Sequence, residues 1–152
     1  MGLSTKRGIN GTSPIASVDL QRSRFGTHFP RVFACAYSLT ENEAAAKEIV
    51  AKAFSRAFVH PADLEDDEFV MLLFATVRDM CRSMPRAQGD GDLSSREREL
   101  LALVFDARLS RDKIRRLMRT TEEAVSAALL GALRKLRESA APAGAKEFFR
   151  PA

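Results

Sequence analysis

The chain has 152 residues, of which 45% are hydrophobic and 29% are charged, and its formal net charge at pH 7 is +4. This composition excludes a disordered, fibrous or collagen-like chain. No apolar run reaches the roughly 18 residues that a membrane span requires, and residues 1–18 lack the apolar segment of a secretory signal peptide. We therefore expect a cytoplasmic protein with no membrane partner.

The charge is unevenly distributed along the chain. Residues 40–79 carry four basic and nine acidic side chains, whereas residues 100–152 carry eleven basic and six acidic ones. An acidic middle followed by a basic end indicates two domains with different partners. The mildly basic total is compatible with nucleic-acid binding but does not demonstrate it.

The first half begins with a Gly-, Ser- and Pro-rich stretch, residues 1–18, which we expect to be a flexible tail. Hydrophobic residues then recur at helical spacing, and no strand pattern appears anywhere. The first helix should begin near Thr27 or Pro30, because proline suits a first helical turn. It would bury an apolar stripe that consists of Phe29, Val32, Phe33, Ala36 and Tyr37.

Two further helices are expected in this half. A capping box at Thr40-Glu41-Asn42-Glu43 predicts the start of the second helix, which should run to about Phe58. The acidic run at residues 63–68 predicts the start of the third, since carboxylates are favourable at a helix N-terminus. This helix should end near Met84-Pro85. The side chains expected to be buried are Ala46, Ile49, Val50, Ala53, Phe54 and Ala57, then Phe69, Leu72, Leu73, Thr76, Val77 and Met80.

The second half follows a polar, glycine-rich segment at residues 87–93, which we interpret as a linker. A capping box at residues 94–97 predicts a helix that runs to about Ala107. Ser110 should cap a short helix, and residues 120–123 should cap a last helix. Residues 109–137 therefore have the spacing of a helix-turn-helix within an all-α fold.

Five short motifs, each weak alone, occur in a fixed order. They are Ala46-Lys47-Glu48-Ile49-Val50-Ala51-Lys52-Ala53-Phe54, Leu72-Leu73-Phe74-Ala75-Thr76-Val77-Arg78-Asp79, residues 93–100, residues 109–125 and residues 132–137. In order and spacing they resemble the extracytoplasmic-function (ECF) family of bacterial RNA polymerase sigma factors. The first is similar to the family's Ala-Glu-Asp-Leu-Val-Gln-x-x-Phe, and the third to Leu-Pro-Pro-x-x-Arg-Glu-Val. The resemblance covers roughly residues 29–138.

The resemblance implies a two-domain architecture and a role in transcription initiation. A sigma region 2-like three-helix bundle would occupy residues 19–86, and a sigma region 4-like helix-turn-helix domain residues 94–138, with a tail at 139–152. The first domain would bind the clamp of core RNA polymerase and hold one separated promoter base. The second would grip the upstream element of promoter DNA. An anti-sigma factor or another regulatory protein is a further implied partner.

A basic cluster on the short helix supports a site in the second half. The cluster consists of Arg111, Lys113, Arg115, Arg116 and Arg119, with Arg108 nearby. It is interpretable as a solvated face, as a phosphate contact or as a dock for an acidic protein. The residues expected to bind DNA are Arg111, Arg115, Arg116, Arg119, Thr120, Ser126 and Arg134. Those expected to bind polymerase or another protein are Lys47, Glu48, Lys52 and Leu130.

The expected recognition helix departs from the family's pattern. Residues 124–133 contain no basic side chain, where the family usually places several. With Val125, Leu129, Ala132 and Leu136 facing inward, the outer face would present Ser126, Ala127, Leu130 and Gly131. Such a surface cannot make bidentate hydrogen bonds to bases, and its exposed Leu suits a helix-packing contact better. Arg119 also replaces the usual glycine of the turn.

The sequence indicates no enzyme. His28 and His60 have no nucleophile or carboxylate constellation around them, so we expect surface or capping roles. No phosphate-binding glycine loop and no metal-ligand cluster is apparent, and we expect no cofactor. Cys35 and Cys81 lie on apolar stripes and are expected to be buried free thiols, with a disulfide or redox switch as the alternative.

Two functional hypotheses remain. The first is a divergent ECF sigma factor that directs core polymerase to promoters. The second is a degenerate sigma-like interaction module that binds an anti-sigma factor or another regulator and does not recognise promoter DNA. The family resemblance favours the first. The second is favoured by the absence of basic side chains from the expected recognition helix. It is also favoured by the short linker, which spans at most about 35 Å when extended.

Overall fold

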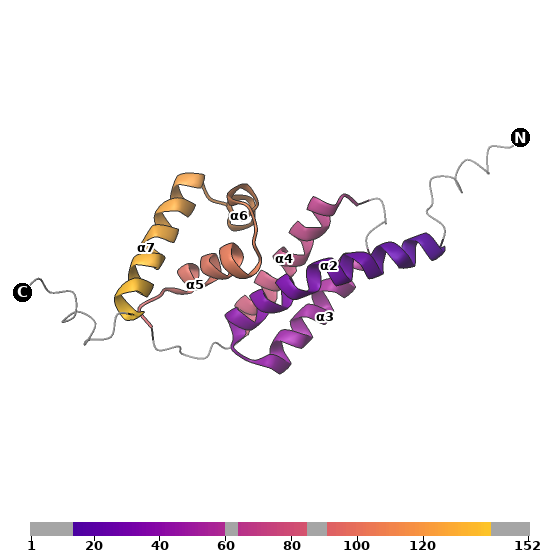
Figure 1. Ribbon diagram of the computed structural model, residues 1–152, viewed down its shortest axis with the longest axis horizontal. Coiled ribbons are helices and arrows are strands. Elements are labelled where there is room, and N and C mark those ends of the chain that lie inside the picture. The colour runs from indigo at the N-terminus through magenta and orange to yellow at the C-terminus, as the bar shows by residue number, and fades with distance from the viewer. Residues whose placement is uncertain (1–13, 60–63, 85–90, 141–152) are drawn as a thin grey trace, which may run out of the picture.

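The computed structural model describes residues 14–59, 64–84 and 91–140, and within these ranges the chain is all-helical, as predicted. The first half contains α2 (Pro14–Thr40), α3 (Glu43–Val59) and α4 (Asp66–Ser83). The second half contains α5 (Ser95–Leu101), the π-helical turn η2 (Ala102–Asp106), α6 (Arg111–Met118) and α7 (Glu122–Ala140). Figure 1 shows α2, α3 and α4 packed together, with α5, α6 and α7 gathered beside them.

The described helices include none whose length and apolar character would allow it to cross a membrane.

The first helix is longer than the sequence patterns suggest. α2 begins at Pro14 and carries Pro30 in its interior, so the expected start near Thr27 or Pro30 is wrong. Proline cannot donate to the carbonyl four residues earlier, which belongs to Gly26. Gly26 is exposed, so the missing hydrogen bond leaves no buried polar atom. Residues 14–18 of the predicted tail belong to α2, whereas residues 1–13 lie outside the described residues.

The buried face of α2 is also rotated from the predicted one. Val32 and Ala36 are buried, but Phe29 and Tyr37 are 36% and 47% exposed, so their predicted burial is wrong. His28 and Cys35 are buried on α2 in place of Phe29 and Tyr37. The aromatic side chains of α2 instead form a row with four-residue spacing, in which successive rings lie 5.1, 5.8 and 6.2 Å apart. The members of this row are Phe25, Phe29, Phe33 and Tyr37.

The core of the first half follows the predicted stripes of the other two helices. All six predicted residues of α3 are buried. On α4, four of the predicted residues are buried, while Leu72 and Met80 are half-buried. The N-terminal cap of α3 differs from the prediction, because the side chain of Asn42, rather than Thr40, accepts the backbone N–H of Ala45 at 3.0 Å.

The second half begins as its capping box predicts. The Ser94 hydroxyl accepts the backbone N–H of Glu97 at 3.1 Å and donates to its carboxylate. The helix then widens into η2, where the N–H of Ala107 bonds to the carbonyl of Ala102 at 2.9 Å. Such π-helical turns are rare, and they interrupt the regular hydrogen bonding of the α-helix. Here the turn is followed by Arg108 in the left-handed region, with φ 54°, which reverses the chain toward α6.

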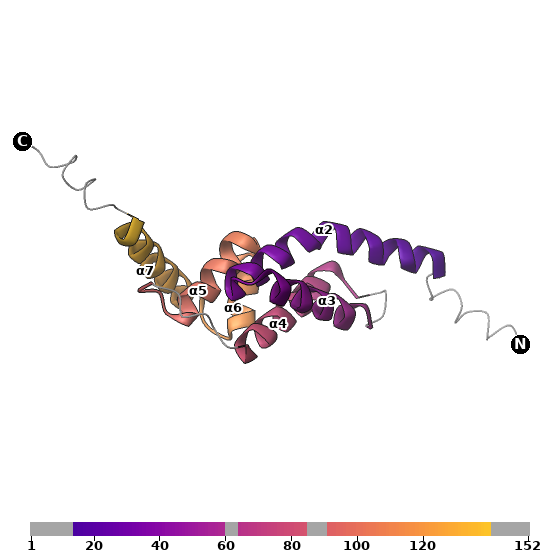
Figure 2. The same cartoon turned by 90° about the horizontal axis from the view of Figure 1, so that it is seen from below.

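Both halves contribute to one hydrophobic cluster. It joins Val32 and Cys35 of α2 to Leu103 of η2, Ile114 of α6 and Val125 of α7. α2 contacts η2, and α4 contacts α6. Figures 1 and 2 show the second half lying against the C-terminal part of α2. Most of the predicted linker, residues 87–90, lies outside the described residues.

The register of η2 can be tested by truncating two side chains of the same turn. Leu103 is fully buried, so Leu103→Ala should lower the free energy of unfolding by about 2–5 kcal/mol. Phe105 is 56% exposed, so Phe105→Ala should change it by no more than about 0.5 kcal/mol. Urea unfolding monitored by circular dichroism measures both, and equal effects would contradict the described register.

Candidate nucleic-acid and partner interface

Residues 110–140 form a helix-turn-helix. The Ser110 hydroxyl accepts the backbone N–H of Lys113 at 3.3 Å and caps α6. The Thr121 hydroxyl accepts the N–H of Ala124 at 3.1 Å and caps α7. Ile114 of α6 and Val125 of α7 are buried in the same hydrophobic cluster, and the two helices contact each other. The expected helix-turn-helix at residues 109–137 is therefore present as two capped helices.

A single left-handed residue makes the turn between the two helices. Arg119 has φ 51° and ψ 55°, the conformation that glycine usually supplies at a helix C-terminus. The next residue, Thr120, is half-buried, and its backbone N–H bonds to the carbonyl of Arg115 at 3.0 Å. Arg119 therefore forms the turn between α6 and α7 at the cost of a strained backbone.

The basic residues of α6 fall into two groups. Arg111, Arg116 and Arg119 are exposed, and no ion pair within the described residues occupies Arg111 or Arg119. Arg115 is half-buried and pairs with Asp112 at 2.5 Å, an arrangement that lowers the pKa of the Asp112 carboxyl and raises that of the guanidinium. Arg134 on α7 is exposed as well. Arg111 at the start of α6, and Arg116 and Arg119 at its end, have the accessibility that phosphate contacts require.

Lys113 forms an ion pair with the other half of the protein. Its ammonium lies 2.8 Å from a carboxylate oxygen of Asp67, at the start of α4 in the other half. The hydrogen bond from Lys113 lowers the pKa of the Asp67 carboxyl, and the charge of Arg116 adds to this effect. The contribution of this pair to stability is therefore complete above the unfolded-state pKa of Asp67 and is lost as the pH falls through the lower, folded-state value.

The outer face of α7 is apolar rather than polar. Leu130 is 64% exposed, as expected, but Leu133 and Leu136 are also exposed, at 38% and 40%. The predicted inward position of Leu136 is thus wrong, and Ser126 and Gly131, expected outside, are half-buried. Leu130 and Leu133 line a shallow surface hollow together with Arg134, Arg137 and Glu138.

The expected partner-binding residues of α3 form a separate charged face. Lys47 and Lys52 are exposed and pair with Glu43 and Glu48, each four residues earlier, at 2.8 and 2.9 Å. Side-chain bonding to Lys47 lowers the pKa of Glu43. Such exposed pairs add little stability, so their side chains can exchange partners at low cost. The structure does not bring this face together with the arginines of α6.

Two buried charges that the sequence analysis missed lie between the halves. Arg78 of α4 and Glu99 of α5 are 8% and 6% exposed and form an ion pair. The guanidinium of Arg78 also donates to the carbonyl of Leu117, near the end of α6. Each of the two residues lies on an apolar stripe, but their separation of 21 positions gives no sequence signal that they meet.

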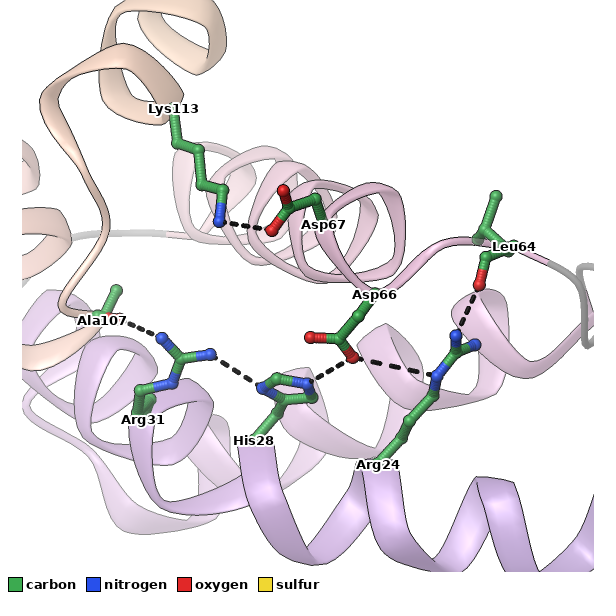
Figure 3. A network of polar contacts seen from close by, with 8 residues as sticks. All are labelled: Arg24, His28, Arg31, Leu64, Asp66, Asp67, Ala107 and Lys113. Atoms are coloured by element: carbon green, nitrogen blue, oxygen red, sulfur yellow. Dashed lines mark hydrogen bonds and ion pairs between the residues drawn. The ribbon is translucent and has the colours of Figure 1, made fainter.

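A second polar network crosses the same boundary (Figure 3). Arg31 of α2 donates to the carbonyl of Ala107 at 3.2 Å and to Nδ1 of His28 at 2.7 Å. Because Nδ1 accepts, Nε2 of His28 carries the hydrogen and donates to Asp66 at 3.1 Å. His28 is 3% exposed, so its expected surface or capping role is wrong. His60 lies outside the described residues.

The described residues hold no group of His, Cys, Asp and Glu side chains that could bind a metal ion. Cys35 and Cys81 are buried, as predicted, and burial raises the pKa of Cys35.

No protein-family model matches the sequence, and no curated protein matches it either.

The cap of α6 gives a local test of the helix-turn-helix. Ser110→Ala should lower the free energy of unfolding by about 1 kcal/mol, because the N–H of Lys113 loses its acceptor. Ser110→Asp keeps an acceptor and should be close to neutral. Thermal unfolding compares the two variants, and a neutral Ser110→Ala would show that this cap does not contribute.

Proposed function

We propose that the chain is a divergent ECF-type sigma factor, a cytoplasmic protein that directs core RNA polymerase to promoters. The observation that carries this proposal is the pair of capped helices α6 and α7, with Arg111 exposed at the start of α6 and Arg116 and Arg119 exposed at its end. Their exposed guanidinium groups are accessible to the phosphates of a duplex. The charged outer face of α3, with Lys47, Glu48 and Lys52, is the proposed contact with polymerase.

The side chains of α7 are unsuited to recognising DNA bases. Its outer face presents Leu130 and Leu133, and its first turn carries Glu122 and Glu123. Neither leucines nor these carboxylates provide the bidentate donors that recognise guanine or adenine edges. The helix-turn-helix would therefore hold the DNA backbone without recognising its sequence. Promoter choice would then depend on the first half of the protein.

Removing exposed arginines from α6 should weaken DNA binding independently of sequence. The Arg111→Ala and Arg116→Ala double variant should lower the slope of log K against log salt by about 2 and weaken binding of any duplex. Arg119 is left unchanged because it is the left-handed residue that forms the turn between α6 and α7. Fluorescence anisotropy of a labelled duplex at several salt concentrations measures the slope.

The matched control removes two exposed arginines from the first half, Arg22 and Arg56. This variant has the same net charge as the α6 variant. Equal losses of affinity in the two double variants would show that binding depends only on net charge, and would contradict a phosphate site on α6.

A second candidate function is favoured by the apolar face of α7. Leu130, Leu133 and Leu136 are exposed on a helix whose equivalent in a DNA-binding domain would carry polar groups. Contiguous exposed apolar surface is typical of protein-binding sites. On this hypothesis the chain is a sigma-like interaction module that binds an anti-sigma factor or another regulator.

Transcription with purified core polymerase separates the two candidates. A sigma factor should support promoter-dependent transcription, and Leu130→Ser should change its yield less than twofold. An interaction module should bind core polymerase or an anti-sigma factor without initiating, and Leu130→Ser should weaken that binding at least tenfold. Polymerase recruitment with initiation that survives Leu130→Ser would exclude the second candidate.

A further inference from the structure

We propose that the exposed face of α7 is a self-association surface, through which two copies of this chain pair antiparallel about Leu130. The pairing goes beyond the proposed function, because it involves neither polymerase nor DNA and can be measured on the purified chain alone. It gives the apolar face of α7 one specific occupant, a second copy of the same helix.

A single stripe of exposed side chains follows the length of α7. Its members are spaced alternately four and three residues apart, and residues with this spacing lie on one side of a helix. The opposite side of α7 carries the buried residues Val125 and Ala132. Figures 1 and 2 show α7 at the end of the protein farthest from α3, where another chain can lie alongside it. The members of the stripe are Glu123, Ala127, Leu130, Arg134 and Arg137.

The charges of this stripe are separated by sign. Glu123 lies in the first turn of α7, whereas Arg134 and Arg137 lie in its C-terminal half, on the other side of Leu130. Within the described residues, no ion pair engages any of these three charged side chains. A second copy that runs in the opposite direction would therefore meet opposite charges at both ends, whereas a parallel copy would meet like charges. The helix dipoles favour the antiparallel arrangement as well.

The positions of the stripe match when two copies cross at Leu130. Glu123 lies seven residues before Leu130 and Arg137 seven residues after it, about two helical turns in each direction. Each Glu123 would thus face Arg137 of the other copy, with Arg134 one turn away. Such a two-fold arrangement uses the same surface on both chains and closes after two copies.

The apolar centre of the stripe also suits this pairing. Leu130 would pack against its own counterpart on the two-fold axis. Leu133 lies three residues after Leu130, and the small side chain of Ala127 lies three residues before it, so a large side chain meets a small one. The shallow hollow lined by Leu130, Leu133 and Arg137 gives the second copy's leucine a place to pack. Pairing would cover the exposed leucines from water.

A dimer made by one helix of each chain has a small interface, so its formation should depend on protein concentration. Sedimentation equilibrium over a range of concentrations measures it. The mass should rise from the 16.8 kDa of one chain toward twice that value. Leu130→Glu should weaken dimer formation at least tenfold, because it places two carboxylates together on the two-fold axis. A wild-type chain that stays monomeric at every concentration would overturn the proposal.

The matched control is Val59→Glu at the end of α3, which makes the same change of charge at another exposed apolar side chain. It should leave the dissociation constant of the dimer unchanged. Circular dichroism checks that both variants keep their helices. Equal weakening in the two variants would show that the effect arises from net charge and not from the face of α7, which would also contradict the pairing.

Charge reversal tests the antiparallel register. Glu123→Arg alone places like charges opposite Arg137 of the other copy, and Arg137→Glu alone places like charges opposite Glu123. Each should weaken dimer formation at least tenfold at low salt, where exposed charges are least screened. The double variant restores opposite charges and should return the dissociation constant close to that of the wild type. Because a purely local effect on α7 would not be rescued in this way, failure of the double variant to recover would exclude the register.

A disulfide across the axis gives an independent test. Leu130→Cys should form a covalent dimer with oxidised glutathione, because the two thiols meet on the two-fold axis. The control is Ser139→Cys, which is exposed on the same helix but lies about two and a half turns from Leu130. Non-reducing electrophoresis compares the two, and equal cross-linking would indicate random collisions and overturn the pairing about Leu130.

The same variants separate this proposal from the second candidate function. If the wild type is monomeric and Leu130→Glu loses binding to core polymerase or to an anti-sigma factor, the face of α7 belongs to that protein and the self-association proposal is wrong. If the wild type dimerises and the charge reversals follow the predicted pattern, the proposal is supported whether or not the chain initiates transcription.

Discussion

The ion pair between Arg78 and Glu99 fixes how the two halves of this protein sit against each other. It joins α4 to α5, and the same guanidinium reaches the end of α6, so one side chain of the first half orients two helices of the second. Removing one partner from such a buried pair typically costs about 3–5 kcal/mol, because the other charge stays desolvated. The apolar cluster around it supplies most of the cohesion, while the charges specify the arrangement.

The surface left exposed by this arrangement divides into regions of different chemistry. Three exposed arginines lie at the two ends of α6, leucines lie on the exposed side of α7, and paired lysines and glutamates lie on α3. Phosphates would be attracted to the first region and an apolar partner to the second. The two candidate functions use different regions, which is why Arg111 and Leu130 variants distinguish them.

Much of the fold follows from local patterns. The all-α class, the buried stripe of α3, the caps at Ser94 and Ser110, and the helix-turn-helix spacing are all set by residues within one or two helical turns of each other. The errors occur where a neighbouring element overrides a local preference. Pro30 is accommodated inside α2, and Phe29 and Tyr37 turn outward because the side facing the core belongs to His28, Val32 and Cys35.

The candidate site divides in the same way. The exposed arginines of α6 and the apolar side chain of Leu130 could be inferred from the sequence, because a helix of known register places its own side chains. The pairing of Lys113 with Asp67, and of Arg78 with Glu99, could not, since each joins positions far apart in the chain whose approach depends on how whole helices pack. Local hydrogen bonding and hydrophobic periodicity involve residues a few positions apart, so they can be recognised in the sequence. The meeting of distant charges follows from the packing of a shared core, and only the folded chain reveals it.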